Sequence, residues 1–344
     1  MESGMANRDL VAIGTSAGGV EALLYLVKRL PHEFPASVLV TIHMPGRARS
    51  SLDEVLTRAG PLPAQFAREG DVVKKGCIYL APPDRHLLLD DYRVLLGIGP
   101  RENNSRPAID AMLRSVAICC GARAIGVVLT GTLGDGASGL WAVRTCGGIT
   151  VVQDPRDAAF AEMPLTALNR ANPDHVVSLS AMPALLAHLV HEPAGDKVPA
   201  PHNLRREVEI ARSARTAMST MDHLGRRSVL SCPDCGGVMW EIDEGDLARY
   251  RCHVGHTYTA ELMSLALDEN LRRALASAQR ALEERVALAF KLHEQAAVKG
   301  QRLLAQTWSD KMRDFERELK IVRDGMQRID QITADREQAE QAAE

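Results

Sequence analysis

Aromatic residues and long apolar runs are scarce in this sequence of 344 residues. Phe, Trp and Tyr together make up 4% of it, and no apolar run approaches the roughly 20 residues that a membrane-spanning helix needs. Neither sign of charge prevails, since 41 Lys and Arg residues against 44 Asp and Glu residues leave a net charge of −3. General nucleic-acid binding relies on excess positive charge. We therefore expect no membrane insertion and no nucleic-acid partner.

The N-terminus lacks the basic and then apolar layout of a secretory signal, so the predicted location is cytoplasmic. Seven cysteines are an odd number for a disulfide framework, and in the cytoplasm they should stay reduced. A chain of this length has room for two or three domains.

The chain has a glycine-rich turn near its start. A β-branched apolar run ends at Gly14 and an apolar helical pattern resumes at Val20, which places Ser16 at the apex of a strand–turn–helix connection. Backbone N–H groups and the positive end of the helix dipole then point toward Ser16. Such a turn suits either a nucleophile whose reaction develops an oxyanion or a bound phosphate.

Strand and helix patterns alternate through the first 191 residues, which predicts a doubly wound α/β fold with a mostly parallel sheet. The short strands between residues 77 and 97 suggest hairpins. The expected strands are 10–14, 37–42, 77–81, 86–89, 93–96, 124–130, 149–153 and 175–178, and the expected helices are 19–30, 49–59, 107–121, 137–146, 165–171 and 181–191.

Three reactive residues follow predicted strands, at the sheet edge where sites form in such folds. Ser16, His43 and Asp135 make up the set that acyl transfer needs, with Ser16 as nucleophile, His43 as base and Asp135 orienting the imidazole. The backbone N–H groups of Ala17 and Thr132 are the expected oxyanion donors. Each residue alone is more often structural, and Asp135 could also cap the helix that follows it.

A dinucleotide site fits less well. The spacing from Gly14 to Gly19 is G-x-x-x-G-G rather than G-x-G-x-x-G, and His43 ends the second strand where a ribose-binding acid is expected. A P-loop would need a lysine after the glycines, and none follows here.

Roughly residues 8–191 resemble the catalytic domain of the chemotaxis-receptor protein-glutamate methylesterases, because several motifs of that domain occur here in the same order. They are Gly14-Thr15-Ser16-Ala17-Gly18-Gly19, His43-Met44-Pro45, Ile78-Tyr79-Leu80-Ala81-Pro82-Pro83, Arg106-Pro107-Ala108-Ile109-Asp110, Leu129-Thr130-Gly131 through Asp135-Gly136, and Gln153-Asp154-Pro155 with Met163-Pro164.

The resemblance implies a serine carboxylesterase that hydrolyses glutamate methyl esters on chemoreceptor-like proteins and releases methanol, with glutamine deamidation in some members. It implies no catalytic cofactor. It places the nucleophile at Ser16, the base at His43, the carboxylate at Asp135 and an oxyanion donor at Thr132. Met44 and Arg106, which lie in shared motifs, are the expected substrate contacts.

Two features depart from the family pattern. Ala17 stands where a threonine is frequent, and Thr132-Leu133 replaces Met-Gly in the loop before Asp135. The family's N-terminal receiver domain is also not expected here, because the catalytic strand begins near Leu10. A catalytically weak scaffold, or an esterase or deamidase for another substrate, is the alternative interpretation.

The second half contains a candidate metal site. Cys232, Cys235, Cys252 and His256 have the spacing C-x2-C-x16-C-x3-H, which fits a structural zinc ion on a small ribbon. His253 is the competing fourth ligand, and three reduced core cysteines are the alternative without metal.

From Thr259 the sequence predicts helix, and an apolar heptad pattern runs from Trp308 to Ile329. Gly300 marks the turn of an antiparallel helix pair, and the alternative is a homodimer or partner-docking coiled coil. The expected domains are an α/β catalytic domain over 1–191, a linker and a helix (204–224) over 192–228, a zinc-ribbon module over 229–258, and the helices over 259–344.

Overall fold

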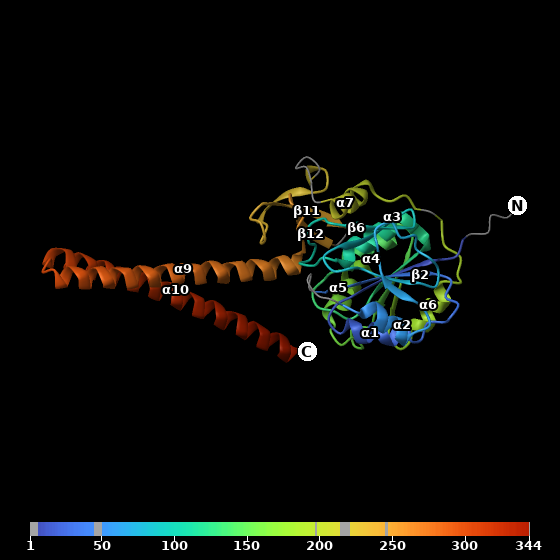
Figure 1. The fold of residues 1–344 in the computed structure, drawn as a ribbon, viewed down its shortest axis with the longest axis horizontal. Coiled ribbons are helices and arrows are strands. Elements are labelled where there is room, and N and C mark those ends of the chain that lie inside the picture. The colour runs from blue at the N-terminus through green and yellow to red at the C-terminus, as the bar shows by residue number, and fades with distance from the viewer. Residues whose placement is uncertain (1–5, 45–49, 197, 214–220, 245–246, 344) are drawn as a thin grey trace. The chain divides into compact units, whose positions relative to one another are not determined.

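The computed structural model describes residues 6–44, 50–196, 198–213, 221–244 and 247–343 (Figure 1). The chain divides into two compact units, Met1–Met263 and Ser264–Glu344. The α/β domain and the Cys-containing ribbon therefore share the first unit. In the part of the chain that the structure describes, no helix is long and apolar enough to cross a membrane.

A seven-stranded parallel sheet forms the centre of the first unit, in the order β3-β4-β2-β1-β7-β8-β9. The doubly wound fold that the sequence predicts is confirmed. The strands are β1 (Leu10–Thr15), β2 (Ser37–Ile42), β3 (Ala64–Phe66), β4 (Ile78–Leu80), β7 (Ala124–Val128), β8 (Ile149–Gln153) and β9 (His175–Val177).

Helices cover both faces of this sheet (Figure 1). Alternate residues of a strand point to opposite faces, so Leu10 and Ala12 of β1 join one core while Val11 and Ile13 join the other. One face carries α1 (Gly19–Val27), α2 (Leu52–Ala59) and α6 (Met182–Leu189), and the other carries α3 (Ile109–Cys120), α4 (Ala137–Thr145) and α5 (Glu162–Ala171).

Two local predictions need correction. The segment expected to form hairpins contains only one, between β5 (His86–Asp90) and β6 (Arg93–Gly97), because β4 pairs in parallel with β2 instead. The short strand β3 was not predicted, since three residues carry too little pattern. Residue 49, the first of the expected helix 49–59, lies outside the described residues.

The strand order places a topological switch point at β1. The chain moves from β1 to β2 on one side and later returns to β7 on the other. In open α/β sheets, the crevice at such a point lies outside the carboxyl ends of the strands and is where ligands bind. The residues after β1, β2 and β7 therefore meet at this edge.

After the α/β domain, α7 (His202–Arg212) packs near α3, and a four-stranded antiparallel ribbon follows. The expected helix 204–224 is wrong in its length, because Ser213 is extended and ends α7; residues 214–220 lie outside the described residues. The ribbon strands are β10 (Arg226–Ser231), β11 (Val238–Glu244), β12 (Leu247–Cys252) and β13 (Thr257–Thr259).

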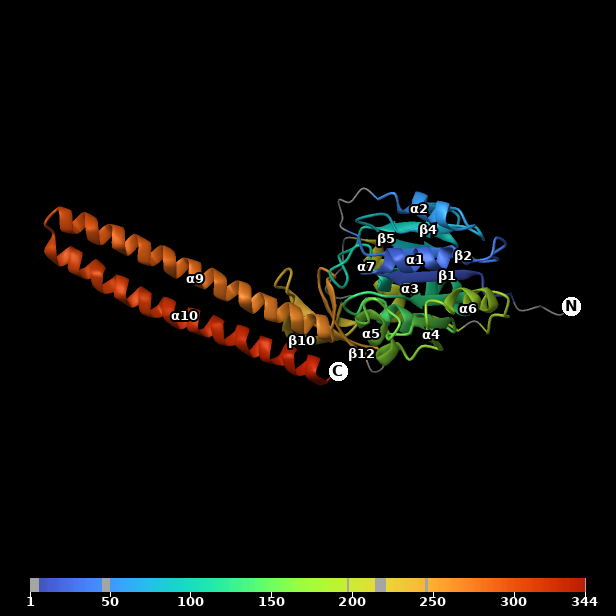
Figure 2. The same ribbon diagram turned by 90° about the horizontal axis from the view of Figure 1, so that it is seen from below.

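Two long helices, α9 (Ala260–Val298) and α10 (Arg302–Ala343), run side by side as an antiparallel pair, as Figure 2 shows. Ion pairs join Arg285 to Glu318 at 3.3 Å and Arg323 to Glu283 at 2.6 Å. Leu319 of the heptad pattern is buried between exposed neighbours. The turn at Gly300, which has φ of 70°, was correctly placed.

Candidate active site

The turn after β1 presents Ser16 at the switch point. Its N–H donates to the Thr130 carbonyl at 3.0 Å, and its own carbonyl accepts from the N–H of Gly19, the first residue of α1. Gly14 has to be glycine because an added Cβ would lie 2.1 Å from the Ile109 side chain. The start of α3 therefore packs directly under the serine turn.

His43 follows β2 and bridges the other two residues. Its Nδ1 lies 3.1 Å from Ser16 Oγ, and its Nε2 lies 2.8 Å from Asp135 Oδ2. A carboxylate can only accept, so Nε2 carries the proton and Nδ1 is free to take one from Ser16. The three residues that the sequence singled out therefore form one hydrogen-bonded chain.

Asp135 is buried and accepts three further hydrogen bonds. The donors are the Ile109 N–H at 2.7 Å, the Asp110 N–H at 3.0 Å and Asn103 Nδ2 at 3.0 Å. Burial alone would raise the pKa of Asp135, but the His43 ring and the hydrogen bonds from the Ile109 N–H and Asn103 hold it below its ordinary value. Asp135 is therefore the ionised carboxylate that a serine–histidine pair needs.

The suggestion that Asp135 caps its own helix is wrong. Asp135 caps the N-terminus of α3, while the carboxylate of Asp110 accepts from the N–H groups of Gly136 and Gly139 at the start of α4. The two helices thus exchange caps, which fixes Asp135 in place. Burial and the neighbouring Asp135 charge raise the pKa of Asp110 well above its ordinary value.

Sequence reasoning missed Asn103 and Asp110 as members of the site. Asp110 stands in the Arg106-Pro107-Ala108-Ile109-Asp110 motif, which could have drawn attention to it. Asn103 carries no comparable signal. Its Nδ2 donates to both carboxylates, at 2.9 Å to Asp110 and 3.0 Å to Asp135.

The two backbone groups expected to bind an oxyanion lie in the serine turn and in the loop before Asp135. Within the described residues, no acceptor binds the N–H of Ala17 or of Thr132. The next N–H in that loop, of Leu133, donates to Glu162 Oε2 at 2.9 Å. Ala17 and Thr132 therefore remain the predicted donors for a substrate oxygen.

The two expected substrate contacts have different surroundings. Arg106 donates to Asp84 at 2.6 Å and to the Gly99 carbonyl at 2.8 Å, so its guanidinium already binds protein acceptors. Met44 is partly buried against the core beside His43. The substrate-binding role of both residues stays a prediction.

The ribbon brings the four candidate metal ligands together. Sγ of Cys232 and Sγ of Cys252 each lie 3.5 Å from Nδ1 of His256, and Sγ of Cys235 lies 3.8 Å from that of Cys252. All four ligand atoms lie within 4.8 Å of one another. His253 is not part of this set, and its ring lies beside Gly237.

A serine, a histidine and a buried carboxylate at the switch point of a parallel sheet define a serine hydrolase of the α/β class. The family model described as CheB methylesterase matches residues 11–186. The chain belongs to this family.

Named relatives share this domain. A putative protein-glutamate methylesterase/protein-glutamine glutaminase of Leptospira interrogans is 35% identical over 184 residues, which cover 53% of this chain and 95% of that protein. The protein-glutamate methylesterase/protein-glutamine glutaminase 1 of Chromobacterium violaceum is 37% identical over 191 residues, which cover 54% of this chain and 53% of that protein. The crystal structure of the Thermotoga maritima CheB methylesterase catalytic domain is 32% identical, with a TM-score of 0.51, over 54% of this chain and all of that one.

Proposed function

We propose that this chain hydrolyses methyl esters of glutamate side chains on a chemoreceptor-like protein. The observation that carries the proposal is the continuous chain of hydrogen bonds from Ser16 through His43 to Asp135. Family membership and the names of the relatives supply the substrate class.

The geometry supports a two-step reaction. Ser16 Oγ attacks the ester carbon while His43 Nδ1 accepts its proton, and the N–H groups of Ala17 and Thr132 stabilise the oxyanion. His43 then protonates the departing methoxide, which leaves as methanol. Water, deprotonated by His43, cleaves the glutamyl–Ser16 ester and restores the enzyme. A glutamine side chain would follow the same route and release ammonia.

The test is methanol release from a methyl-esterified chemoreceptor fragment, with ammonia release from its glutamine form measured in parallel. We expect methanol from the full chain and only a trace from Ser16→Ala, because that variant provides no nucleophile for the ester. A folded chain that releases no methanol would contradict the proposed substrate. Activity that is equal in the two proteins would contradict the proposed site.

We also propose that Cys232, Cys235, Cys252 and His256 hold a structural zinc ion. Zinc bonds of about 2.3 Å to sulfur and about 2.0 Å to nitrogen in a tetrahedron separate two sulfurs by roughly 3.8 Å, and sulfur from nitrogen by roughly 3.5 Å. The distances of 3.8 Å and 3.5 Å among these atoms support that geometry. Three thiolates and an imidazole leave no open position, which favours a structural ion.

Metal analysis checks this proposal. We expect about one zinc ion per chain, falling to background in Cys235→Ser, which removes the exposed ligand. Cys77→Ser, a cysteine outside the ribbon, is the control and should keep its zinc. Wild-type protein that carries no zinc after growth with the metal would reject the site.

A further inference from the structure

The ribbon contacts the loop that carries Asn103, and this contact suggests a link between the metal site and the catalytic carboxylate. We propose that the metal-bound ribbon holds Asn103 in the position from which it orients Asp135, so that loss of the metal weakens the serine site. The proposal rests on the proposed zinc site and on the Ser16–His43–Asp135 chemistry. It does not depend on which ester is the substrate.

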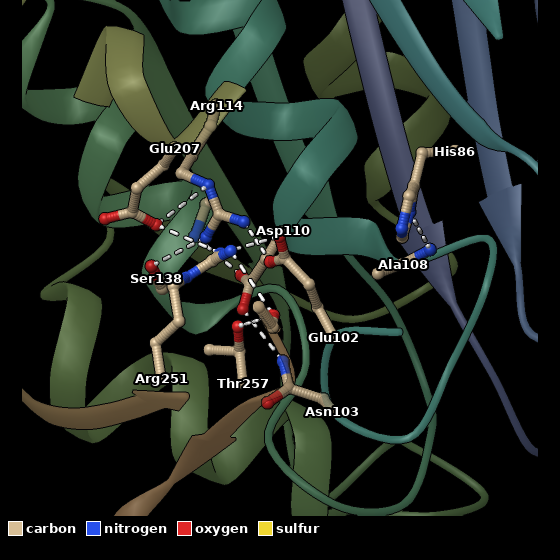
Figure 3. Close-up of polar contacts among 12 residues, drawn as sticks. His86, Glu102, Asn103, Ala108, Asp110, Arg114, Ser138, Glu207, Arg251 and Thr257 are labelled. Carbon is tan, nitrogen blue, oxygen red and sulfur yellow. Dashed lines mark hydrogen bonds and ion pairs between the residues drawn. The ribbon is translucent and has the colours of Figure 1, made fainter. Parts of the chain in front are cut away.

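The α/β domain anchors the loop at its ends. His86 Nε2–H donates to the Pro100 carbonyl at 2.8 Å, and His86 Nδ1 accepts from the Ala108 N–H at 3.2 Å (Figure 3). Arg106 adds its hydrogen bond to the Gly99 carbonyl. Both ends of the loop are therefore fixed without the ribbon.

The tip of the loop is a tight turn from Glu102 to Ser105. The Glu102 and Ser105 N–H groups each donate to the other's carbonyl, and Asn103 and Asn104 between them have φ of 48° and 61°. Asparagine tolerates this left-handed region better than most residues. The turn directs the buried Asn103 side chain at Asp135 and Asp110, while Asn104 is exposed.

The ribbon holds this tip in two ways. The Asn103 N–H donates to the Thr257 carbonyl at 2.9 Å, and Arg251 pairs with the Glu102 carboxylate at 2.7 Å (Figure 3). Thr257 directly follows the candidate ligand His256, and Arg251 directly precedes Cys252. The two contacts thus come from the strand ends that the metal would join.

The pair between Arg251 and Glu102 is part of a fully buried ionic cluster. Arg114 also binds Glu102, and Arg249 binds Glu207 at 2.6 Å. The arginines hold the pKa of each glutamate below its ordinary value despite burial, so the carboxylates stay ionised. Breaking a buried pair leaves an uncompensated charge, so the ribbon cannot withdraw without disturbing the tip of the loop.

The test needs a readout that does not require the natural substrate. A fluorophosphonate probe forms a bond from Ser16 Oγ to phosphorus, releases fluoride and passes the hydroxyl proton to His43, so its rate reports the serine site alone. Asn103→Gly removes the side-chain donor but suits the positive φ. Asn104→Gly makes the same exchange at the exposed neighbour and is the matched control.

We expect Asn103→Gly to slow labelling by about 10- to 100-fold, the range found when a partner that orients a metal-ligating side chain is lost. Asn104→Gly should change the labelling rate less than twofold.

Zinc removal from the full chain should slow labelling by a similar factor and speed hydrogen exchange at the Asn103 N–H, with both restored by Zn²⁺. In Asn103→Gly, zinc removal should add no further loss, since the affected contact is already absent. The proposal would be overturned if zinc removal slowed labelling of Asn103→Gly as much as it slows labelling of wild type. It would also be overturned if zinc removal had no effect on wild type, or if Asn103→Gly were labelled at the normal rate. Labelling without methanol release would overturn the proposed substrate only.

Discussion

Ser16→Ala is expected to lower kcat for ester hydrolysis by on the order of 10⁶, the loss seen when a serine nucleophile is removed from a working triad. Alanine leaves His43 and Asp135 in place but provides no atom to form the acyl intermediate. The backbone donors of the two turns remain, so a small residual rate over water should persist. Methanol release under single-turnover conditions measures the effect.

Two controls make this loss interpretable. Ser51→Ala changes an exposed serine whose side chain makes no capping hydrogen bond, and it should keep full activity. The unfolding midpoint of Ser16→Ala should equal that of wild type, because Ser16 is only partly buried. If Ser16→Ala retained a tenth of the wild-type rate, another group would have to be the nucleophile.

The sequence allowed us to predict that Ser16, His43 and Asp135 meet because each of them follows a strand with a clear pattern. Apolar, β-branched runs end just before Ser16 and His43, and a third ends before the loop of Asp135. In a parallel sheet, those ends lie at one edge. The same logic could not find Asn103, because its contact depends on a turn of two left-handed residues in a loop without periodicity.

The buried ionic cluster was also beyond sequence reasoning. Charged residues are almost always exposed unless paired, so Glu102 and Arg251 look like surface residues in a sequence. Their pairing spans 149 positions and depends on how the ribbon packs against the α/β domain. The four candidate metal ligands, by contrast, could be recognised by their spacing, since all of them lie within one short segment.

Asp135→Asn should lower kcat by about 10⁴-fold, as loss of the triad carboxylate does elsewhere. Four donors converge on Asp135, and an amide would have to turn its NH₂ toward one of them. An amide NH₂ facing His43 Nε2 favours the tautomer with the proton on Nδ1, which cannot accept one from Ser16. The charge that stabilises the imidazolium is lost as well.

Asp110→Asn is the matched comparison, because Asp110 is equally buried, shares the donor Asn103 and lies one hydrogen bond from Asp135. It does not contact the His43 ring, and its raised pKa means that loss of its charge changes less. We expect the fold-loss in kcat caused by Asp110→Asn to be at least a hundred times smaller than the fold-loss caused by Asp135→Asn. Both are measured at one pH on folded proteins. Equal losses, or a greater loss at Asp110, would show that the carboxylate supporting His43 has been assigned to the wrong residue.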